Sequence, residues 1–224
     1  MRCSPSGRNV GRRRLLGFGL ALGAGVTPAL GAAPASAATP PASGAPGTRG
    51  APAPDTPTPA PTSDAVASWG RQAATVAAAQ IGVPYAWGGG DRLGASIGFC
   101  DEENGYLNGQ CLGENTVGFD CSGLALFCWY RASGGAVDLA HYTVAQYHRS
   151  TPVAARDLLP GDLLFFSRRD APLHHVGVYA GGGAMIHAEH TGTLVARLSD
   201  VLEDPRWAPE FAGGRRPLPL ARPA

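Results

Sequence analysis

The chemistry in this sequence centres on a cysteine placed between an acid and a hydroxyl, in the segment GFDCSGLALFCWY at residues 118–130. From Cys121 onward, apolar residues recur at steps of three and four, which predicts one face of a helix. Asp120 is a natural N-cap for this helix, so Cys121 would be its first residue. Free N–H groups and the helix dipole at such a position stabilise a thiolate. Cys121 is therefore a candidate nucleophile, whereas Cys128, further along the same stripe, is assigned to the core.

A cysteine nucleophile needs a base, and the segment HHVGVYAGGGAMIHAEH at residues 174–190 supplies histidines. If its glycines form a three-residue hairpin turn, His175 and His187 share one sheet face as diagonal neighbours. Gly177 would leave the space between them open. His174 and His190 would fall on the other face. The pattern thus predicts a nucleophile on a helix start, a base on a strand and an orienting partner on the next strand. A two-residue turn would shift the pairing by one residue and place His175 and His187 on opposite faces of the sheet.

The same histidines could instead bind zinc. Strand alternation divides them between two faces, however, and the sequence has no H-E-x-x-H helix and no C-x-x-C pair. We therefore expect neither a metal site nor a cofactor.

The first residues predict an export signal at 1–37. An arginine cluster at residues 12–14 precedes an apolar run, and Ala35-Ser36-Ala37 has the form of a cleavage site. The adjacent arginines are typical of the twin-arginine type. Glycines and Pro28 interrupt the run before the ~20 apolar residues that a membrane span needs. Residues 38–62 hold eight of the 20 prolines and predict a disordered, extended linker.

Charge argues against nucleic acid as a partner. The 13 arginines and 17 acidic residues after Ala37 give this part of the chain a charge of −4, and the chain has no lysine. A basic footprint for nucleic acid is thus missing. No contact with the membrane is expected after signal cleavage.

Four cysteines follow the signal, and an exported protein favours disulfides. Two helical turns would separate Cys121 from Cys128 by ~10 Å, too far for a disulfide. Cys100 and Cys111 lie in an acidic, glycine-rich segment at residues 91–118. We expect a surface loop closed by a Cys100–Cys111 disulfide, worth roughly 3 kcal/mol in the chain-entropy model.

The order of elements predicts an α+β fold. A first helix starts at Ser63-Asp64 and ends before Gly82, the helix at Cys121 ends at Ser133-Gly134-Gly135, and a short helix covers residues 140–149. Then come short β-rich runs separated by turn residues: DLLFF, HVGVYA, AMIHAE and TLVARL. Helices followed by antiparallel strands define this class.

The segments GVPYAWGGG, GFDCSGL, PGDLLFF and HVGVYAGGGAMIHA, in this order and spacing, resemble the NlpC family of bacterial cell-wall cysteine peptidases, which are papain-like in fold. The likeness covers about residues 70–215, within a catalytic domain placed at 63–218. It implies that Cys121 is the nucleophile, His175 the general base and His187 the orienting residue.

The resemblance also concerns the substrate. It implies that Tyr85 lines the site and that Asp120 and Ser122 contact substrate. The family's usual substrate is the peptidoglycan stem peptide, cut between γ-D-glutamate and diaminopimelate or lysine. We also considered that Asp120 receives a free ammonium of a peptide already released from its glycan.

The expected protein is a secreted, monomeric thiol protease that hydrolyses peptidoglycan stem peptides in the cell wall, for wall remodelling or cell separation, with or without a wall-associated activator. Other reactions of the same Cys-His site stay open: an amidase, a transpeptidase or a toxin against a competitor's wall. A non-catalytic wall-binding module is a further alternative, although a pure binder would not need Cys121, His175 and His187 together.

Overall fold

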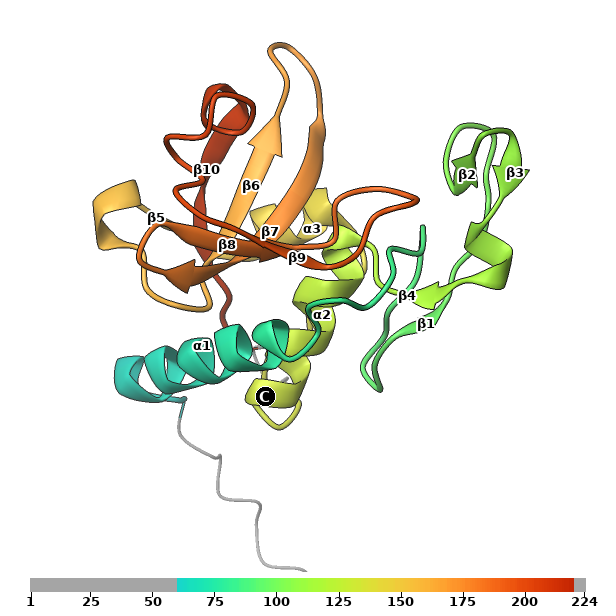
Figure 1. Cartoon of the computed structure of the whole chain (residues 1–224). Coiled ribbons are helices and arrows are strands. Elements are labelled where there is room, and N and C mark those ends of the chain that lie inside the picture. The colour runs from blue at the N-terminus through green and yellow to red at the C-terminus, as the bar shows by residue number, and fades with distance from the viewer. Residues whose placement is uncertain (1–59, 220–224) are drawn as a thin grey trace, which may run out of the picture. The chain divides into compact units, whose positions relative to one another are not determined.

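Helices precede the main sheet in the computed structural model, which describes residues 60–219 (Figure 1). The predicted export signal and nearly all of the predicted linker therefore lie outside the described residues. The helices are α1 (Ser63–Ala78), α2 (Cys121–Ala132) and α3 (Thr143–His148), with short 3-10 turns at Gly113–Asn115, Ala155–Asp157 and Ala208–Glu210. Within the described residues, no helix is long and apolar enough to cross a membrane.

Side-chain caps fix where the two long helices begin. Thr62 Oγ1 accepts the Ala65 N–H at 3.3 Å, one residue earlier than the predicted start of α1. Asp120 caps α2 by accepting the Gly123 N–H at 2.7 Å. Such caps satisfy backbone donors that have no intrahelical partner. The sequence therefore predicted the start of α2 correctly.

The main sheet has six antiparallel strands in the order β5-β10-β6-β7-β8-β9. Their bounds are β5 Thr151–Val153, β6 Leu163–Ser167, β7 Leu173–Gly181, β8 Ala184–His187, β9 Ala196–Leu198 and β10 Phe211–Arg216. The four predicted β-rich runs became β6 to β9. This is the α+β papain-like arrangement that the sequence predicted, with helices packed on an antiparallel sheet.

Two strands of this sheet, β5 and β10, were not predicted. β10 has the sequence FAGGRR, whose glycines and arginines show no apolar alternation, yet it lies between β5 and β6. Its pairing comes from chain segments far apart in the sequence, such as Gly214 with Val153 and Leu164. No local pattern announces a strand of this kind.

The segment 91–118 forms small strands of its own: β1 (Ser96–Ile97) pairs with β4 (Val117–Gly118), and β2 (Tyr106–Leu107) pairs with β3 (Gln110–Cys111). Figure 1 shows it projecting to one side of the main sheet. A disulfide joins Cys100 and Cys111, with their Cα atoms 6.0 Å apart.

The β7–β8 turn differs from the prediction. Gly181 pairs with Ala184, so only Gly182 and Gly183 form the turn, and both have positive φ, as a tight hairpin turn requires. An irregularity between Tyr179 and Gly181 restores the register, because Tyr179 pairs with Met185 as in the predicted alignment. A bulge of this kind inserts one residue and so reverses the parity change of the shorter turn.

Gly177 also has a different role from the predicted one. The space beside it is not open, since a Cβ at this position would lie 2.3 Å from Met185 Sδ and 2.5 Å from its Cγ. Gly177 thus makes room for the buried Met185 side chain.

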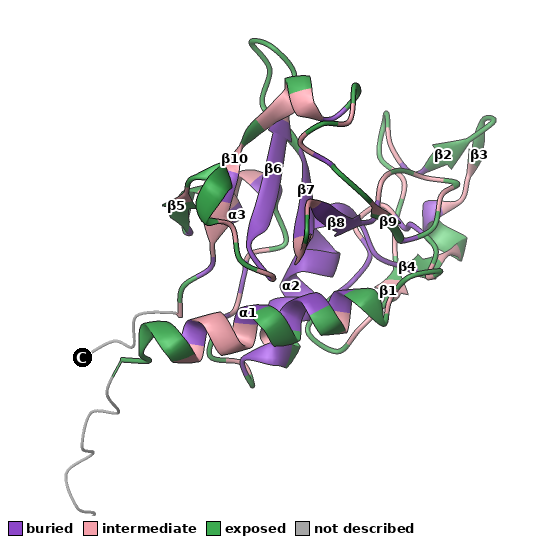
Figure 2. Cartoon of the chain, turned by 60° about the vertical axis from the view of Figure 1, so that its left-hand side comes forward, coloured by how far each residue is buried: buried purple, intermediate pink, exposed green. Residues whose placement is uncertain are grey.

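Both faces of the inner strands β6 and β8 are buried, as Figure 2 shows. On one face, Phe165 and Val176 join the side chains of α1 and α2 in the larger core cluster. On the other face, Phe166 and Met185 pack with Trp207 in a smaller cluster. Phe166 and Trp207 of this second cluster pack against His175, and Trp207 also packs against His187.

Helix α1 approaches the turn before β6 at a contact between two glycines. A Cβ on Gly161 would lie 2.3 Å from Gly70 Cα, and Gly161 has φ +96°. The Gly161 carbonyl also accepts the buried Trp129 indole N–H at 2.9 Å. Only glycine fits here, because both the backbone angle and the space exclude a side chain.

We predict that Gly161→Ala lowers the free energy of unfolding by roughly 2–5 kcal/mol, the sum of a left-handed backbone and a steric overlap. Gly134→Ala is the matched control, since Gly134 also has positive φ but a Cβ there would meet no atom within 4 Å. It should cost only about 1–2 kcal/mol. Urea unfolding followed by tryptophan fluorescence measures both, and equal losses would contradict the proposed glycine contact.

Candidate active site

Cys121 lies at the point where α2 meets β7. Its side chain is the first of α2, and Sγ is 3.8 Å from Thr143 Oγ1 at the start of α3. Backbone groups of Val176 and Ser122 hydrogen-bond to the sulfur. The residue is 9% exposed. The nucleophile predicted from the sequence is thus placed beside the strand that carries His175.

His175 on β7 and His187 on β8 form a hydrogen-bonded pair. His175 Nε2 is 3.0 Å from His187 Nδ1, and the ring centroids are 5.1 Å apart, nearly perpendicular. Their exposed fractions are 2% and 3%. The structure therefore brings the two histidines together as the hairpin alignment predicted, although the turn itself is shorter.

The other two histidines of this segment belong elsewhere. His174 Nε2 is 3.0 Å from Glu210 Oε2, and the exposed His190 lies near Glu189. Among the described residues, no group of three or more histidine, cysteine or acidic side chains is arranged to hold a metal ion.

Trp207 encloses the histidine pair, and nothing in the sequence pointed to it. Its ring centroid lies 4.8 Å from that of His175 and 5.3 Å from that of His187. Arg206, the preceding residue, lies over the Trp207 ring and forms an ion pair with Glu189. Trp207 comes from a turn-rich segment without periodicity, so only the tertiary structure reveals its position.

Burial reverses the expected charge state of the thiol. The helix start was expected to lower the pKa of Cys121, but burial, followed by the nearby Asp120 carboxylate, raises it to about 12. Hydrogen bonds from Thr143, Val176 and Ser122 oppose this shift without overcoming it. At neutral pH the buried sulfur is a thiol. The general reason is that low dielectric disfavours the charged form.

The pKa values of His175 and His187 are both lowered, which favours the neutral form of each ring. Burial first, and then the electrostatic interactions with His187, His174 and Arg206, hold the pKa of His175 well below its usual range. Burial also lowers the pKa of His187, with Glu189 opposing. Both imidazoles are therefore neutral at neutral pH, and His175 can accept a proton.

Asp120 is buried and fully hydrogen-bonded within the protein. Oδ1 accepts from the Gly123 N–H at 2.7 Å and the Ser122 hydroxyl at 3.0 Å. Oδ2 accepts from the Gly88 N–H at 3.1 Å and lies 2.9 Å from His141 Nε2. A substrate ammonium could bind this carboxylate only by displacing one of these groups.

Tyr85 lies close to Cys121. Its pKa is raised above its usual range by burial and then by the neighbouring Cys121, Asp120 and Asp101. The backbone of Tyr85 forms a bridge to Phe119, two residues before Cys121. This bridge brings the segment around residues 84–90 alongside the start of α2.

The α3 segment contributes side chains that the sequence did not mark. Thr143 contacts Cys121, and His141 contacts Asp120. The fully buried Gln146 donates its Nε2 to the Ser122 and Ala140 carbonyls at 2.9 and 2.8 Å. The segment AHYTVAQYHR looked like an ordinary short helix, so no sequence signal separated these residues from surface polar ones.

The 91–118 segment contacts two other parts of the chain, one near Tyr85 and one in the loop after β8. The Trp87 indole donates to Asp101 at 2.9 Å, next to the segment that carries Tyr85. At the far end, a Cβ on Gly192 would lie 3.0 Å from Leu107 Cδ2. The segment therefore reaches from residue 87 to the loop after β8.

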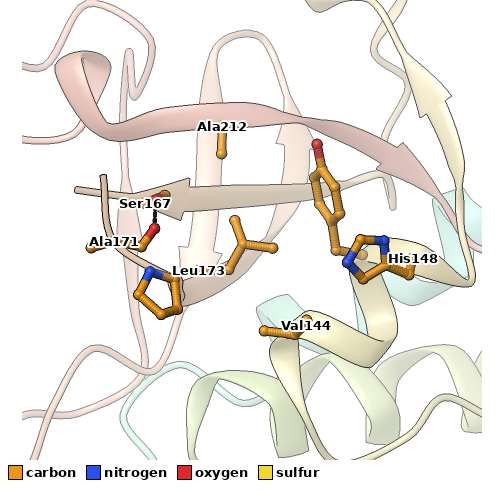
Figure 3. A pocket seen from close by; sticks show the side chains of 8 residues that line it. Val144, His148, Ser167, Ala171, Leu173 and Ala212 are labelled. Carbon is orange, nitrogen blue, oxygen red and sulfur yellow. Dashed lines mark hydrogen bonds between the residues drawn. The ribbon is translucent and has the colours of Figure 1, made fainter. Parts of the chain in front are cut away.

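A hollow of about 320 Å³ lies on the other side of α3. Figure 3 shows Val144 and His148 of α3 on one side and Leu173 and Ala212, from β7 and β10, on another. Its lining includes neither Cys121 nor the histidine pair. It is a mainly apolar recess beside the site and not the place of the chemistry.

Comparison with known proteins agrees with this fold and site. The model of the NlpC/P60 family matches residues 82–216, which is more than half of the chain. The chain therefore belongs to the NlpC/P60 family, and the resemblance seen in its motifs is confirmed.

The curated relatives are longer than the region they share with this chain. Peptidoglycan endopeptidase RipA of Mycolicibacterium smegmatis is 38% identical over 116 residues, covering 52% of this chain and 20% of RipA. Probable endopeptidase YafL of Escherichia coli is 33% identical over 140 residues, covering 62% of this chain and 46% of YafL. The chain thus spans less than half the length of either.

Solved structures of similar proteins superpose on this fold as well. A variant of the resuscitation promoting factor interacting protein RipA superposes with a TM-score of 0.55 at 28% identity, over 73% of this chain and 71% of that one. The P60 domain of a Mycobacterium avium subspecies paratuberculosis antigen gives 0.50 at 27% identity, over 68% of this chain and 99% of that domain.

The depressed histidine pKa values predict a pH-dependent stability. The unfolded histidines titrate near ~6.5 and the folded ones lower, so the unfolded state binds more protons below ~6.5. The free energy of unfolding should therefore fall as pH drops from about 6.5 toward 4.5. In His175→Asn/His187→Gln this decline should be shallower. His190→Gln, which removes an exposed histidine, is the control for urea unfolding at each pH. A slope that is the same in all three proteins would contradict the assignment.

Proposed function

We propose that this chain is a cysteine endopeptidase that hydrolyses peptidoglycan stem peptides. The observations that carry the proposal are the placement of Cys121 Sγ beside the backbone of Val176, the residue that follows His175 on β7, and the buried, hydrogen-bonded His175–His187 pair. Membership of the NlpC/P60 family supports the same reaction, as do the names of the relatives RipA and YafL.

The proton path follows from the hydrogen bond between the histidines. If His175 takes the thiol proton on Nδ1, its own proton stands on Nε2 and is donated to His187 Nδ1. His187 thereby fixes both the tautomer and the orientation of His175. Because thiol and imidazole both start neutral, the proton leaves Sγ as the sulfur attacks the amide carbonyl.

The start of α2 supplies donors for the developing oxyanion. Asp120 already caps the Gly123 N–H, while the Cys121 N–H, which has no intrahelical acceptor, can point at a carbonyl oxygen above the sulfur. Collapse of the tetrahedral species breaks the C–N bond, and imidazolium His175 gives its proton to the departing amine. Water then hydrolyses the thioester, with His175 accepting a proton again.

The finer assignments concern the bond and the setting. We propose cleavage between γ-D-glutamate and diaminopimelate, with Tyr85, Asp120 and Ser122 lining the substrate side of the nucleophile. We further propose that the protein is exported through the signal at residues 1–37 and acts in the cell wall, in wall remodelling or cell separation. The support is the motif resemblance and the export-type N-terminal sequence.

We predict that Cys121→Ala abolishes release of peptide fragments from purified peptidoglycan, and from a free L-Ala-γ-D-Glu-diaminopimelate tripeptide, read by mass spectrometry. His175→Ala should reduce kcat/KM by about 10²- to 10⁴-fold, the usual contribution of a general base. Cys128→Ala is the matched control, because Cys128 is the other free, buried cysteine of the described residues and lies in the larger core two turns further along α2. It should retain activity.

The reaction products also distinguish the proposed endopeptidase from an amidase, a transpeptidase and a non-catalytic binding module. An L-Ala-D-Glu dipeptide released by the wild type alone supports the proposed bond, whereas a stem peptide freed from its glycan would indicate an amidase. A new cross-link would indicate a transpeptidase. Wall binding by a folded protein without any cleavage would favour the binding module, and cleavage by Cys121→Ala would rule out the proposed nucleophile.

A further inference from the structure

The carboxylate next to the nucleophile has no unused acceptor position. Each oxygen of Asp120 has two partners, from the backbone of Gly88 and Gly123 and from the side chains of Ser122 and His141. A carboxylate has about four such positions, so the set is complete. The buried group is thus held rigidly between three chain segments.

This arrangement has an electrostatic cost for the reaction. A negative charge one residue before Cys121 opposes formation of a second negative charge on its sulfur, and Asp120 indeed raises the pKa of this thiol. Three of its four partners are neutral donors. His141 is the one partner that can carry a positive charge.

His141 is well placed for this role. Nε2 is 2.9 Å from Asp120 Oδ2, and its side chain is 29% exposed, so it can exchange protons with solvent. A Cβ at residue 123 would lie 2.9 Å from His141 Nε2, so the glycine at that position lets the ring reach the helix start.

The charged surroundings of His141 favour its protonated form. The hydrogen bond to Asp120 raises the pKa of His141, burial opposes this, and Asp91 in the 88–95 loop adds to the rise. On its own loop, Asp138 is paired with Arg92 at 2.8 Å. The titratable groups that act on the sulfur itself or feel its charge are Asp120 and Tyr85.

We propose that His141 is a positioning residue for the nucleophile: its imidazolium, held on Asp120 Oδ2, keeps the N-cap carboxylate in place and offsets the negative charge of that carboxylate beside Cys121 Sγ. The sulfur can then ionise during attack without facing an unbalanced anion. This inference rests on the proposed function only in taking Cys121 as the reacting group.

The test is the rate constant for alkylation of Cys121 by iodoacetamide from pH 6 to pH 10 in the full chain, with mass spectrometry to locate the label. His141→Gln keeps a hydrogen-bond donor without the charge. At pH 6 its rate constant should be lower than that of the wild type by about three- to tenfold, as for loss of one nearby charge. The difference should vanish toward pH 10, where wild-type His141 is neutral.

His141→Arg keeps both donor and charge, since arginine stays protonated throughout this range. It should match the wild type at pH 6 and exceed it at pH 9. Arg92→Gln is the matched control, because Arg92 is a nearby cation bonded to Asp138 and not to Asp120. Its profile should follow the wild type.

A folded His141→Gln protein with the wild-type rate constant at pH 6 would overturn the proposal, as would an arginine variant that follows the glutamine one. If the glutamine variant does not fold, the comparison of His141→Arg with the wild type at pH 9 still decides. Because alkylation needs no peptide, a negative result here is distinguishable from failure of the proposed peptidase activity.

Discussion

The start of α2 depends on one buried carboxylate. Asp120 joins the Gly88 loop, the first turn of α2 and the His141 segment through four hydrogen bonds. Burying a charge is costly unless its hydrogen-bonding positions are filled, and here they all are. Cys121 follows Asp120 as the first residue of α2, and its sulfur lies beside the backbone of Val176 on β7. Stability at this point and the placement of the nucleophile are therefore one arrangement.

The burial of the His175–His187 pair depends on the smaller core cluster, which contains Phe166 and Trp207. Trp207 and Phe166 pack against His175, so that the pair lies in a low-dielectric layer and not in an open cleft. Burial makes both imidazoles and the thiol neutral. In the proposed mechanism, one proton therefore moves from Sγ to His175 at the moment of attack. In the proposed mechanism, the hydrogen bond that His175 Nε2 donates to His187 matters because a neutral imidazole has only one acceptor nitrogen, which this bond leaves as Nδ1.

Much of the fold followed from local rules. Caps and apolar spacing predicted the bounds of α2, and short β-rich runs predicted β6 to β9. The strand β10 could not be predicted, because glycines and arginines acquire strand geometry there only through partners on β5 and β6. The β7–β8 register was right although its turn was not, because a bulge compensated for the shorter loop. Register is set by which side chains must be buried, and the turn adapts to it.

By itself, the sequence determined which residues are candidates for the reaction: a cysteine at a helix start, and histidines of matching parity on neighbouring strands. Those features depend on short-range periodicity and capping, which neighbouring residues encode. The tertiary structure decided the charge state of these groups and the identity of their supports. Burial reversed the expected shift of the Cys121 pKa, and His141 and Trp207 reached the site from distant segments. Desolvation and long-range packing belong to the assembled fold, so no local pattern could specify them.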